Sequence, residues 1–178
     1  EVLLFVSDGL KELGNVFLEE FPKAQYQACW VHLGRAMCRH ARNKDWKEVL
    51  GEAKKIYGST SKEEAEKQLS SFIEKYEGKY PKAVNVIRDN PSLFSFYDYP
   101  AEIQRSLYTS NPIESFNKKY KKNIRKKEQF HNEDSLDRFT CAIASDYNKQ
   151  FESRQMKGFS KCSYELQQLF EERYGSKG

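Results

Sequence analysis

Short apolar runs and one amphipathic stretch follow one another at the start of the chain. Residues 2–6 are all Val, Leu or Phe, a run that is too short for a helix and is typical of a strand buried on both faces. Apolar residues then recur at helical spacing from Leu10 to Phe21, and residues 24–30 favour a second short strand. A strand, a helix and a strand within about 30 residues predict a parallel βαβ unit with a right-handed crossover.

Helical spacing of the apolar residues dominates the remainder. It predicts helices over 31–42, 45–57, 62–76, 81–88, 135–154 and 163–174. Ser61 and Glu64 have the spacing of a capping box, and Asn90-Pro91 has the form of an N-cap followed by proline at the first helical position. The pattern predicts a helix-dominated α/β protein with about two parallel strands.

Composition narrows the class of protein. The 178 residues suit one domain, or one domain with a sizeable insertion, and 38% hydrophobic residues can build its core. Mean hydropathy is −0.86, and no apolar run approaches the roughly 18 residues of a membrane span, so we expect a soluble protein with no membrane partner. Four cysteines are too few for a disulfide framework, which favours a reducing, cytoplasmic location.

Positive charge is concentrated in one segment. The formal net charge of the chain is +4. Residues 101–130 contain eight Lys and Arg against three acids, whereas the charges of the other residues nearly balance. Seven of these cations fall within 118–127, more than solubility requires, although a solvated helix end has the same pattern. Such a distribution is expected where a protein meets a polyanion such as DNA.

An acidic residue directly follows the first predicted strand. Asp8 stands in Ser7-Asp8-Gly9, at the carboxyl end of the apolar run, where open α/β sheets bind their ligands. The same tripeptide is also good turn chemistry, because aspartate can bond its own backbone and glycine accepts positive φ. Asp8 is therefore either a ligand-binding carboxylate or a turn residue.

A second acid opens a basic amphipathic helix. On a helix that starts at Pro112, one apolar stripe can pack inward, formed by Ile113, Phe116, Tyr120 and Ile124. Another face carries Glu114 in the first turn, followed by Asn117, Lys118, Lys121 and Arg125. Taken alone, a first-turn glutamate stabilises the helix dipole and the lysines solubilise the helix surface.

The two acids together suggest a more specific chemistry. Two carboxylates on different elements can hold the pair of divalent ions that stabilise the attacking and leaving oxygens in phosphodiester cleavage. Nearby lysines bind phosphates. Asp8 and Glu114 are therefore candidate catalytic and metal-binding residues.

Three separate motifs occur along the chain in a recognisable order. They are Val-Ser-Asp-Gly at 6–9, Cys-Trp-Val-His at 29–32 and Tyr-Thr-Ser-Asn-Pro-Ile-Glu-Ser-Phe-Asn at 108–117. In order and spacing they resemble the Mutator-type transposases of bacterial insertion sequences, over nearly the whole chain. The resemblance implies a partial RNase H-like core with an all-helical insertion: sheet residues at 1–30, the insertion at 31–107 and C-terminal core helices at 108–178.

The resemblance also implies roles for single residues. Asp8 corresponds to the second acid of a catalytic DDE triad and Glu114 to the third, and both would hold Mg²⁺ or Mn²⁺. Lys121 matches a basic residue that contacts DNA near the cut, and His32 belongs to a Cys-x-x-His signature. His32 either orients a carboxylate or a phosphate or is a lone core histidine. The expected DNA-binding residues are His32, Lys118, Lys121, Lys122 and Arg125.

The implied enzyme is a DNA transposase that cleaves the ends of a mobile element and transfers them to target DNA. The family's first aspartate precedes anything in this chain, so we expect a part of a longer protein that is inactive alone. Its sheet would lack strands, which exposes an edge or favours dimerisation. The expected partner is double-stranded DNA, in a complex of two or more catalytic subunits at the bacterial nucleoid.

Other interpretations of the same residues stay open. Two thiolates and two imidazoles offer a zinc site at Cys29, His32, Cys38 and His40. However, Cys38 and His40 are two residues apart and would point to different faces of a helix.

Aromatic side chains either stack on unpaired bases or, as is more common, pack in a core; they are Trp30, Trp46, Phe94, Phe96, Tyr97 and Tyr99. The rival functions are a non-catalytic DNA-binding or assembly module and another α/β hydrolase with a strand-end aspartate.

Overall fold

The chain forms two compact units in the computed structural model. The structure describes residues 1–175 except 10, 110, 128, 155 and 157, and it does not describe the side chains of 11, 111 and 112. The first unit comprises Glu1–Thr109 and Lys157–Gly178, and the second comprises Ser110–Met156. Within the described residues, the sheet belongs to the first unit and the second is helical.

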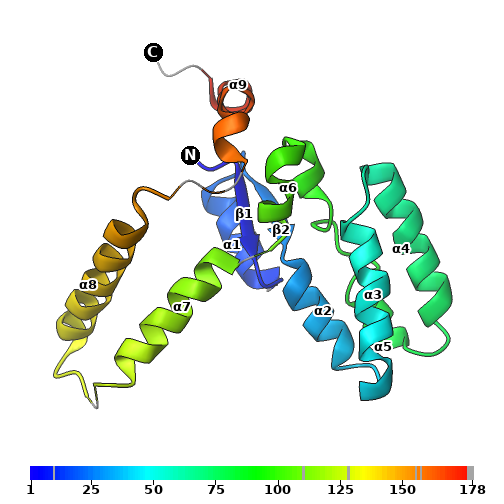
Figure 1. The fold of residues 1–178 in the computed structure, drawn as a ribbon, viewed down its shortest axis with the longest axis horizontal. Helices are drawn as coiled ribbons and strands as arrows, with labels where there is room; N and C mark the ends of the chain where they lie inside the picture. The colour runs from blue at the N-terminus through cyan, green and yellow to red at the C-terminus, as the bar shows by residue number, and fades with distance from the viewer. Residues whose placement is uncertain (10, 110, 128, 155, 157, 176–178) are drawn as a thin grey trace. The chain divides into compact units, whose positions relative to one another are not determined.

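A two-stranded parallel sheet opens the first unit (Figure 1). β1 (Leu4–Ser7) pairs with β2 (Gln25–Ala28), and the register places Ser7 opposite Ala28. α1 (Lys11–Glu20) connects the two strands, so the predicted βαβ unit is confirmed. Because the strands are parallel, both carboxyl ends lie at the same edge of the sheet.

α1 covers one face of the sheet through aromatic side chains. Phe17 stacks on Phe5 of β1, with 4.0 Å between the ring centroids. Other apolar positions of the predicted helical pattern remain in solvent, since Leu13 is 44% and Val16 is 57% exposed. Leu10 lies outside the described residues. The spacing predicted the helix correctly, but two strands are too narrow a surface to bury its whole apolar face.

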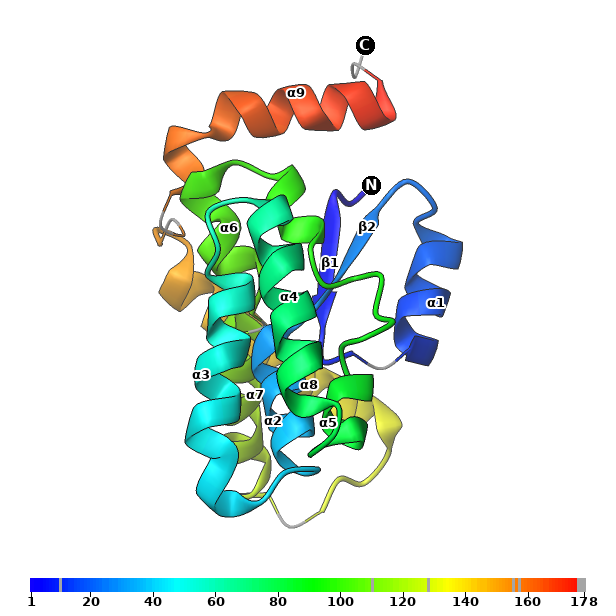
Figure 2. The same ribbon diagram turned by 90° about the vertical axis from the view of Figure 1, so that its right-hand side faces the viewer.

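The opposite face of the sheet packs against two helices. These are α6 (Ala101–Leu107) and α9 (Ser163–Tyr174), and Figure 2 shows α9 beyond the amino end of β1. A small cluster of buried side chains includes Ile103 and Cys162, and Leu4 of β1 packs against it. A 3-10 helix at Phe159–Lys161 leads into α9.

Side chains from distant parts of the sequence form hydrogen bonds with the first residues of the chain. The Leu3 carbonyl accepts the Tyr99 hydroxyl at 2.8 Å and Nη1 of Arg173 at 2.7 Å. The Tyr174 hydroxyl donates to the Val2 carbonyl at 2.6 Å and lies 3.3 Å from the Val2 nitrogen. The amino end of β1 is therefore held by side chains that lie far away in the sequence.

The residues from 30 to 107 form helices around one apolar core (Figure 1). In addition to α6, the elements are α2 (Trp30–Cys38), α3 (Trp46–Tyr57), α4 (Lys62–Tyr76), α5 (Pro81–Asn85) and 3-10 helices at Asn43–Asp45 and Ser95–Asp98. Buried side chains from several of these elements share the core, among them Trp30, Met37, Ile56, Phe72 and Phe96. The helices predicted over 31–42, 45–57, 62–76 and 81–88 are present, with ends that differ from the prediction by at most four residues.

Two predicted helix starts have different outcomes. The Ser61 hydroxyl accepts the Glu64 N–H at 3.2 Å, as in a capping box, but the Glu64 carboxylate accepts the N–H of Thr60 at 2.8 Å. At Asn90-Pro91 the prediction was wrong, because a turn follows in which Oδ1 of Asn90 accepts the Ser92 N–H at 2.9 Å. Asparagine favours both caps and turns, so the local sequence does not decide between them.

A buried glutamine joins β2 to the segment before α6. The Gln27 side chain is fully buried. Its Nε2 donates to the Leu93 carbonyl at 3.0 Å, and its Oε1 accepts the Phe96 N–H at 3.1 Å. Nε1 of Trp30 donates to the same Leu93 carbonyl at 3.0 Å. The amide thus satisfies a buried backbone N–H that has to find a partner inside the protein.

The second unit is a hairpin of two antiparallel helices. α7 (Asn111–Ile124) packs on α8 (Glu133–Phe151), and Phe116 meets Tyr147 edge to face with 5.3 Å between ring centroids. Aromatic contacts of this kind add to the apolar surface that the hairpin buries.

The inward stripe predicted on α7 is only partly buried. Phe116, Tyr120 and Ile124 are half-buried, whereas Ile113 is 54% exposed. Among the described residues of the hairpin, Ile143 is the one that is classed as buried, and it is still 8% exposed. Two helices leave the ends of such a stripe in solvent because they can cover each other only where they cross.

The helix-dominated α/β class is confirmed, with one two-stranded parallel sheet in the described residues. The RNase H-like core and the division at residues 30 and 107 stay predictions. None of the helices seen in the described part of the chain has the length and apolar composition needed to cross a membrane.

Replacing Gln27 with leucine should destabilise the first unit. The substitution leaves the buried Phe96 N–H without a partner, which costs about 1–3 kcal/mol of unfolding free energy. Urea denaturation should show this loss for Gln27→Leu. The control Gln167→Leu changes an exposed glutamine on α9 and should stay within about 0.5 kcal/mol of the unmodified protein; equal stability of the two variants would contradict the assigned role.

Candidate functional site

Asp8 lies immediately after β1, at the carboxyl edge of the parallel sheet. Gly9 has a φ of +92°, a conformation that glycine adopts readily, and its N–H lies 3.5 Å from the Ser7 hydroxyl oxygen. The Asp8 side chain is exposed, and it has no hydrogen-bond or ion-pair partner within the described part of the chain. Its carboxylate is therefore accessible to a ligand.

The start of α2 is held beside this acid. The Cys29 N–H donates to the Ser7 carbonyl at 2.7 Å, which continues the parallel ladder one residue beyond β2. α2 begins at the next residue, so its first turn emerges at the edge where Asp8 stands. The position of His32 in that turn follows from this geometry.

Asp8 and His32 line one hollow of about 730 Å³ in the first unit. Its walls come from the end of β1, from α1 and α2, and from residues 85–92. The charged and amide side chains in its lining include Asp8, His32, Arg39, Asn85, Asp89 and Asn90. Two of the predicted site residues thus share a concave surface with several that no sequence pattern indicated.

Side chains with nitrogen donors lie on one face of α2. Nη1 of Arg35 lies 3.4 Å from Nε2 of His32, and Arg39 follows at the end of the helix. Arg39 stands seven residues after His32, which is two helical turns and hence the same face. That spacing was visible in the sequence, but no sequence pattern connected residues 85–90 with Asp8.

The basic residues of the second unit divide into two groups. Lys119 packs inside the hairpin: its Nζ lies 2.7 Å from Oδ2 of Asp146 and 3.1 Å from Oε1 of Gln150. This ammonium group lowers the pKa of Asp146. Other cations of this unit are exposed, and the four predicted DNA-binding residues among them have no acidic partner in the described part of the chain; these are Lys118, Lys121, Lys122 and Arg125.

Glu114 lies in the first turn of α7, on the same helix as these cations. It belongs to the second unit and Asp8 to the first, so the two candidate acids are positioned by different units. Both are carboxylates, the oxygen ligands that Mg²⁺ prefers. Among the described residues, no three His, Cys, Asp or Glu side chains are close enough together to hold a metal ion. The donor chemistry fits a hard divalent cation, and neither unit alone supplies a full ligand set within those residues.

Comparison with known proteins identifies the family of the chain. The model of the family described as "Transposase, Mutator family" matches residues 1–154. The chain belongs to this family. Both candidate acids lie within the matched range, as do His32 and the exposed cations of α7.

Curated relatives of this Mutator-family chain are transposases of insertion sequences. The IS905 transposase of Lactococcus lactis subsp. lactis (strain IL1403) is 34% identical over 171 residues, which are 96% of the chain and 44% of that relative. The IS1201 transposase of Lactobacillus helveticus is 34% identical over 148 residues, 83% of the chain and 40% of the relative. The ISRM3 transposase of Rhizobium meliloti (strain 1021) is 29% identical over 153 residues, 85% of the chain and 38% of the relative. The Mutator-family chain thus spans less than half the length of these relatives.

The four candidate zinc ligands of the Mutator-family chain differ in their burial. Cys29 and Cys38 are buried, whereas His40 is exposed. Burial raises the pKa of the Cys38 thiol, which disfavours the thiolate that zinc binds. In the described part of the chain no three His, Cys, Asp or Glu side chains form a group that could hold a metal ion, so the structure does not support the zinc alternative.

Most of the aromatic residues considered for base stacking belong to the core. Trp30, Phe96 and Tyr99 are buried. Phe94 and Tyr97 are partly buried and pack against the core that contains Trp30 and Phe96. The exception is the Trp46 side chain, which is 40% exposed, although its Nε1 donates to the Ala41 carbonyl at 3.1 Å.

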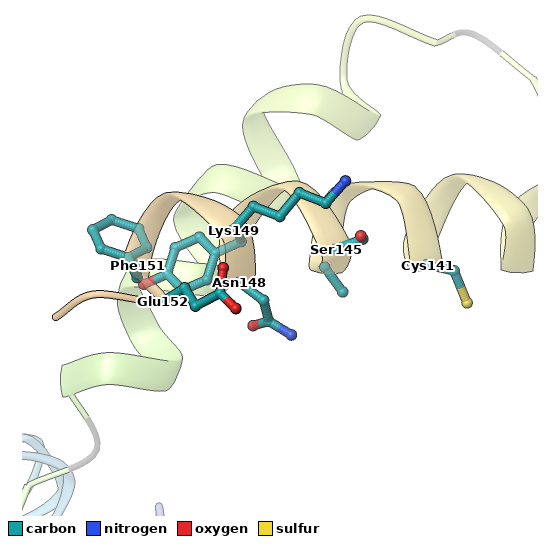
Figure 3. A pocket seen from close by; sticks show the side chains of 8 residues that line it. Cys141, Ser145, Asn148, Lys149, Phe151 and Glu152 are labelled. Atoms are coloured by element: carbon teal, nitrogen blue, oxygen red, sulfur yellow. The ribbon is translucent and has the colours of Figure 1, made fainter. Parts of the chain in front are cut away.

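A second hollow, of about 650 Å³, runs along α8 of the Mutator-family chain (Figure 3). Its lining residues come from this one helix and from Glu152, which directly follows it. One helix cannot enclose a ligand on several sides, so this surface lacks the convergent polar groups of a binding pocket.

Removing the internal lysine of α7 should loosen the hairpin. Lys119→Ala deletes the contacts to Asp146 and Gln150, whereas the control Lys118→Ala removes an exposed neighbouring cation. Backbone amides of α8 should exchange with D₂O faster in Lys119→Ala only, as followed by mass spectrometry. Equal exchange in the two variants would show that Lys119 does not hold the helices together.

Proposed function

We propose that this chain supplies two of the carboxylates with which a Mutator-family transposase cuts and joins DNA. The supporting observation is the exposed Asp8 carboxylate, which follows a parallel strand and shares a hollow with His32, in a chain of this family. The proposal covers cleavage at mobile-element ends and transfer to target DNA. Because the chain spans less than half the length of its relatives, the activity is proposed for a protein of their length.

Asp8 and Glu114 are the proposed ligands for Mg²⁺ or Mn²⁺. When bound, the ions would stabilise the attacking and leaving oxygens of the phosphodiester. The backbone of β1 and the turn at Gly9 fix Asp8, and the first turn of α7 carries Glu114. His32 orients a carboxylate or phosphate in the hollow, and its ring is positioned by the contact with Arg35.

The exposed cations of α7 are the proposed contacts to the DNA backbone. Lys118, Lys121, Lys122 and Arg125 are exposed, and within the described residues no acid neutralises them. Binding of such residues to phosphates releases condensed counterions and thereby drives association without regard to base sequence. Lys119 is excluded from this role because it pairs with Asp146.

The proposed working form contains at least two copies of the catalytic chain. A mobile element has two ends, and each end requires a catalytic site. The named relatives belong to bacterial insertion sequences, which supports action in the bacterial cytoplasm, at the nucleoid.

Conservative replacement of either acid in the full-length protein should abolish cleavage without abolishing DNA binding. Asp8→Asn and Glu114→Gln each keep the shape of the side chain but remove the charge that holds a cation. Losing a residue that only supports a metal ligand costs about 10–100-fold in metal affinity or activity. We therefore expect loss of a ligand itself to lower cleavage of element-end DNA by more than about 100-fold. Gel-shift affinity should change little.

The matched control for this experiment is Glu12→Gln. Glu12 stands in the first turn of α1, as Glu114 does in α7, and has no proposed role at the site. Cleavage by the control should equal that of the unmodified enzyme. Normal strand transfer by Asp8→Asn or Glu114→Gln would refute the catalytic assignment.

Combined replacement of Lys121, Lys122 and Arg125 by alanine should weaken DNA binding and flatten its salt dependence. Each lost phosphate contact lowers the slope of log K against log salt by about 0.9 on duplex DNA. The control changes three exposed lysines of the first unit, Lys47, Lys54 and Lys82. Anisotropy titrations over a range of salt concentrations measure both slopes, and an unchanged slope in the α7 variant would place the DNA elsewhere.

A further inference from the structure

The hollow beside Asp8 has the size of a small-molecule site. Its volume of about 730 Å³ falls in the range of about 300–1,000 Å³ that is usual for ligand pockets. Apolar and polar side chains share its lining: Leu33, Val86 and Pro91 lie together with Arg39 and Asn85. A phosphate group alone would fill a small part of this space and would use none of the apolar surface.

The charges of the lining also argue against an isolated phosphate. Arg39 is balanced by two carboxylates, Asp8 and Asp89, which line the same hollow. Inorganic phosphate, which at neutral pH is a mixture of singly and doubly charged forms, would be repelled by these acids. A nucleotide within a DNA strand carries a single charge on its phosphodiester and a neutral base. The lining therefore suits one cation-bound phosphate together with an uncharged, hydrogen-bonding ring.

Groups that can bind a base edge stand on the segment 85–90. The amides of Asn85 and Asn90 both donate and accept, and the Asp89 carboxylate accepts from an exocyclic amino group. Oδ1 of Asn90 accepts the Ser92 N–H at 2.9 Å, which fixes the orientation of that amide. A base in a duplex is stacked and paired, so it can present itself to a concave surface only after leaving the stack.

We propose that this hollow receives one unpaired nucleotide of the DNA strand that is cut. Arg39 binds its phosphate, Leu33 and Val86 pack against the base, and Asn85 and Asp89 bind the base edge. The inference rests on the proposed function in one respect, because Asp8 lines the same hollow. It adds a binding site for an extruded nucleotide to the phosphate contacts proposed on α7.

Binding of short single strands to the 178-residue chain tests the proposal. The probe is a fluorescent five-residue oligodeoxycytidine, and its control is an abasic strand of the same length and charge. Arg39→Ala should weaken oligodeoxycytidine binding about tenfold, as expected for loss of one charge-assisted contact, and lower the salt slope by about 0.7. Asn85→Ala should weaken binding of oligodeoxycytidine but not of the abasic strand.

Arg42→Ala is the matched control variant. Arg42 is exposed and follows α2 by a few residues, but it does not line the hollow, so its replacement should change affinity less than twofold. Equal binding of the abasic and the cytidine strand would overturn the proposal, and so would equal losses in Arg39→Ala and Arg42→Ala.

One further variant separates this inference from the proposed catalytic role. Asp8→Asn should keep the preference for oligodeoxycytidine over the abasic strand, because the base-binding groups remain. If Asp8→Asn loses cleavage but no variant prefers oligodeoxycytidine over the abasic strand, the nucleotide site is refuted and the catalytic role is not. A clear preference combined with normal cleavage by Asp8→Asn would refute the catalytic role alone.

Discussion

The hydrogen bond between the Cys29 N–H and the Ser7 carbonyl is the contact on which the candidate site depends. It extends the parallel pairing of β1 and β2 by one residue and thereby brings the end of one strand and the start of α2 to the same edge. Asp8 and His32 are 24 positions apart in the sequence, yet both line one hollow as a result. Parallel strands have this property in general, which is why open α/β sheets bind ligands at their carboxyl edge.

The basic residues of α7 have different surroundings although they are close together in the sequence. Lys119 and Lys118 are neighbours in the sequence, but a helix turns by about 100° at each residue. One side chain therefore reaches Asp146 on α8, and the other stays in solvent. Charge counting identifies a surface that attracts polyanions, and only the packing of α7 on α8 shows which cations remain available to it.

Much of the fold follows from local pattern. The spacing of apolar residues predicts the βαβ unit and the helices, because burial on one face imposes a period that survives in the sequence. Of the candidate site, Asp8 and Glu114 were predictable as acids at a strand end and in a first helical turn. The wall of the hollow at Asn85 and Asp89 was not, since nothing local indicates that residues 85–90 return to β1. The turn at Asn90 shows the same limit, because an asparagine side chain caps a helix or closes a turn with the same hydrogen bond.

The hydrogen bonds to the Leu3 carbonyl have a consequence for the order in which the protein folds. Their donors, Tyr99 and Arg173, are synthesised long after the strand they hold, and Tyr174 reaches back to Val2 across 172 positions. Contacts of such high sequence separation form late, after the entropy of closing a long loop has been overcome. Until residues 99–174 have been synthesised, the amino end of β1 therefore lacks the side-chain hydrogen bonds that hold it, and this part of the sheet reaches its final arrangement late in folding.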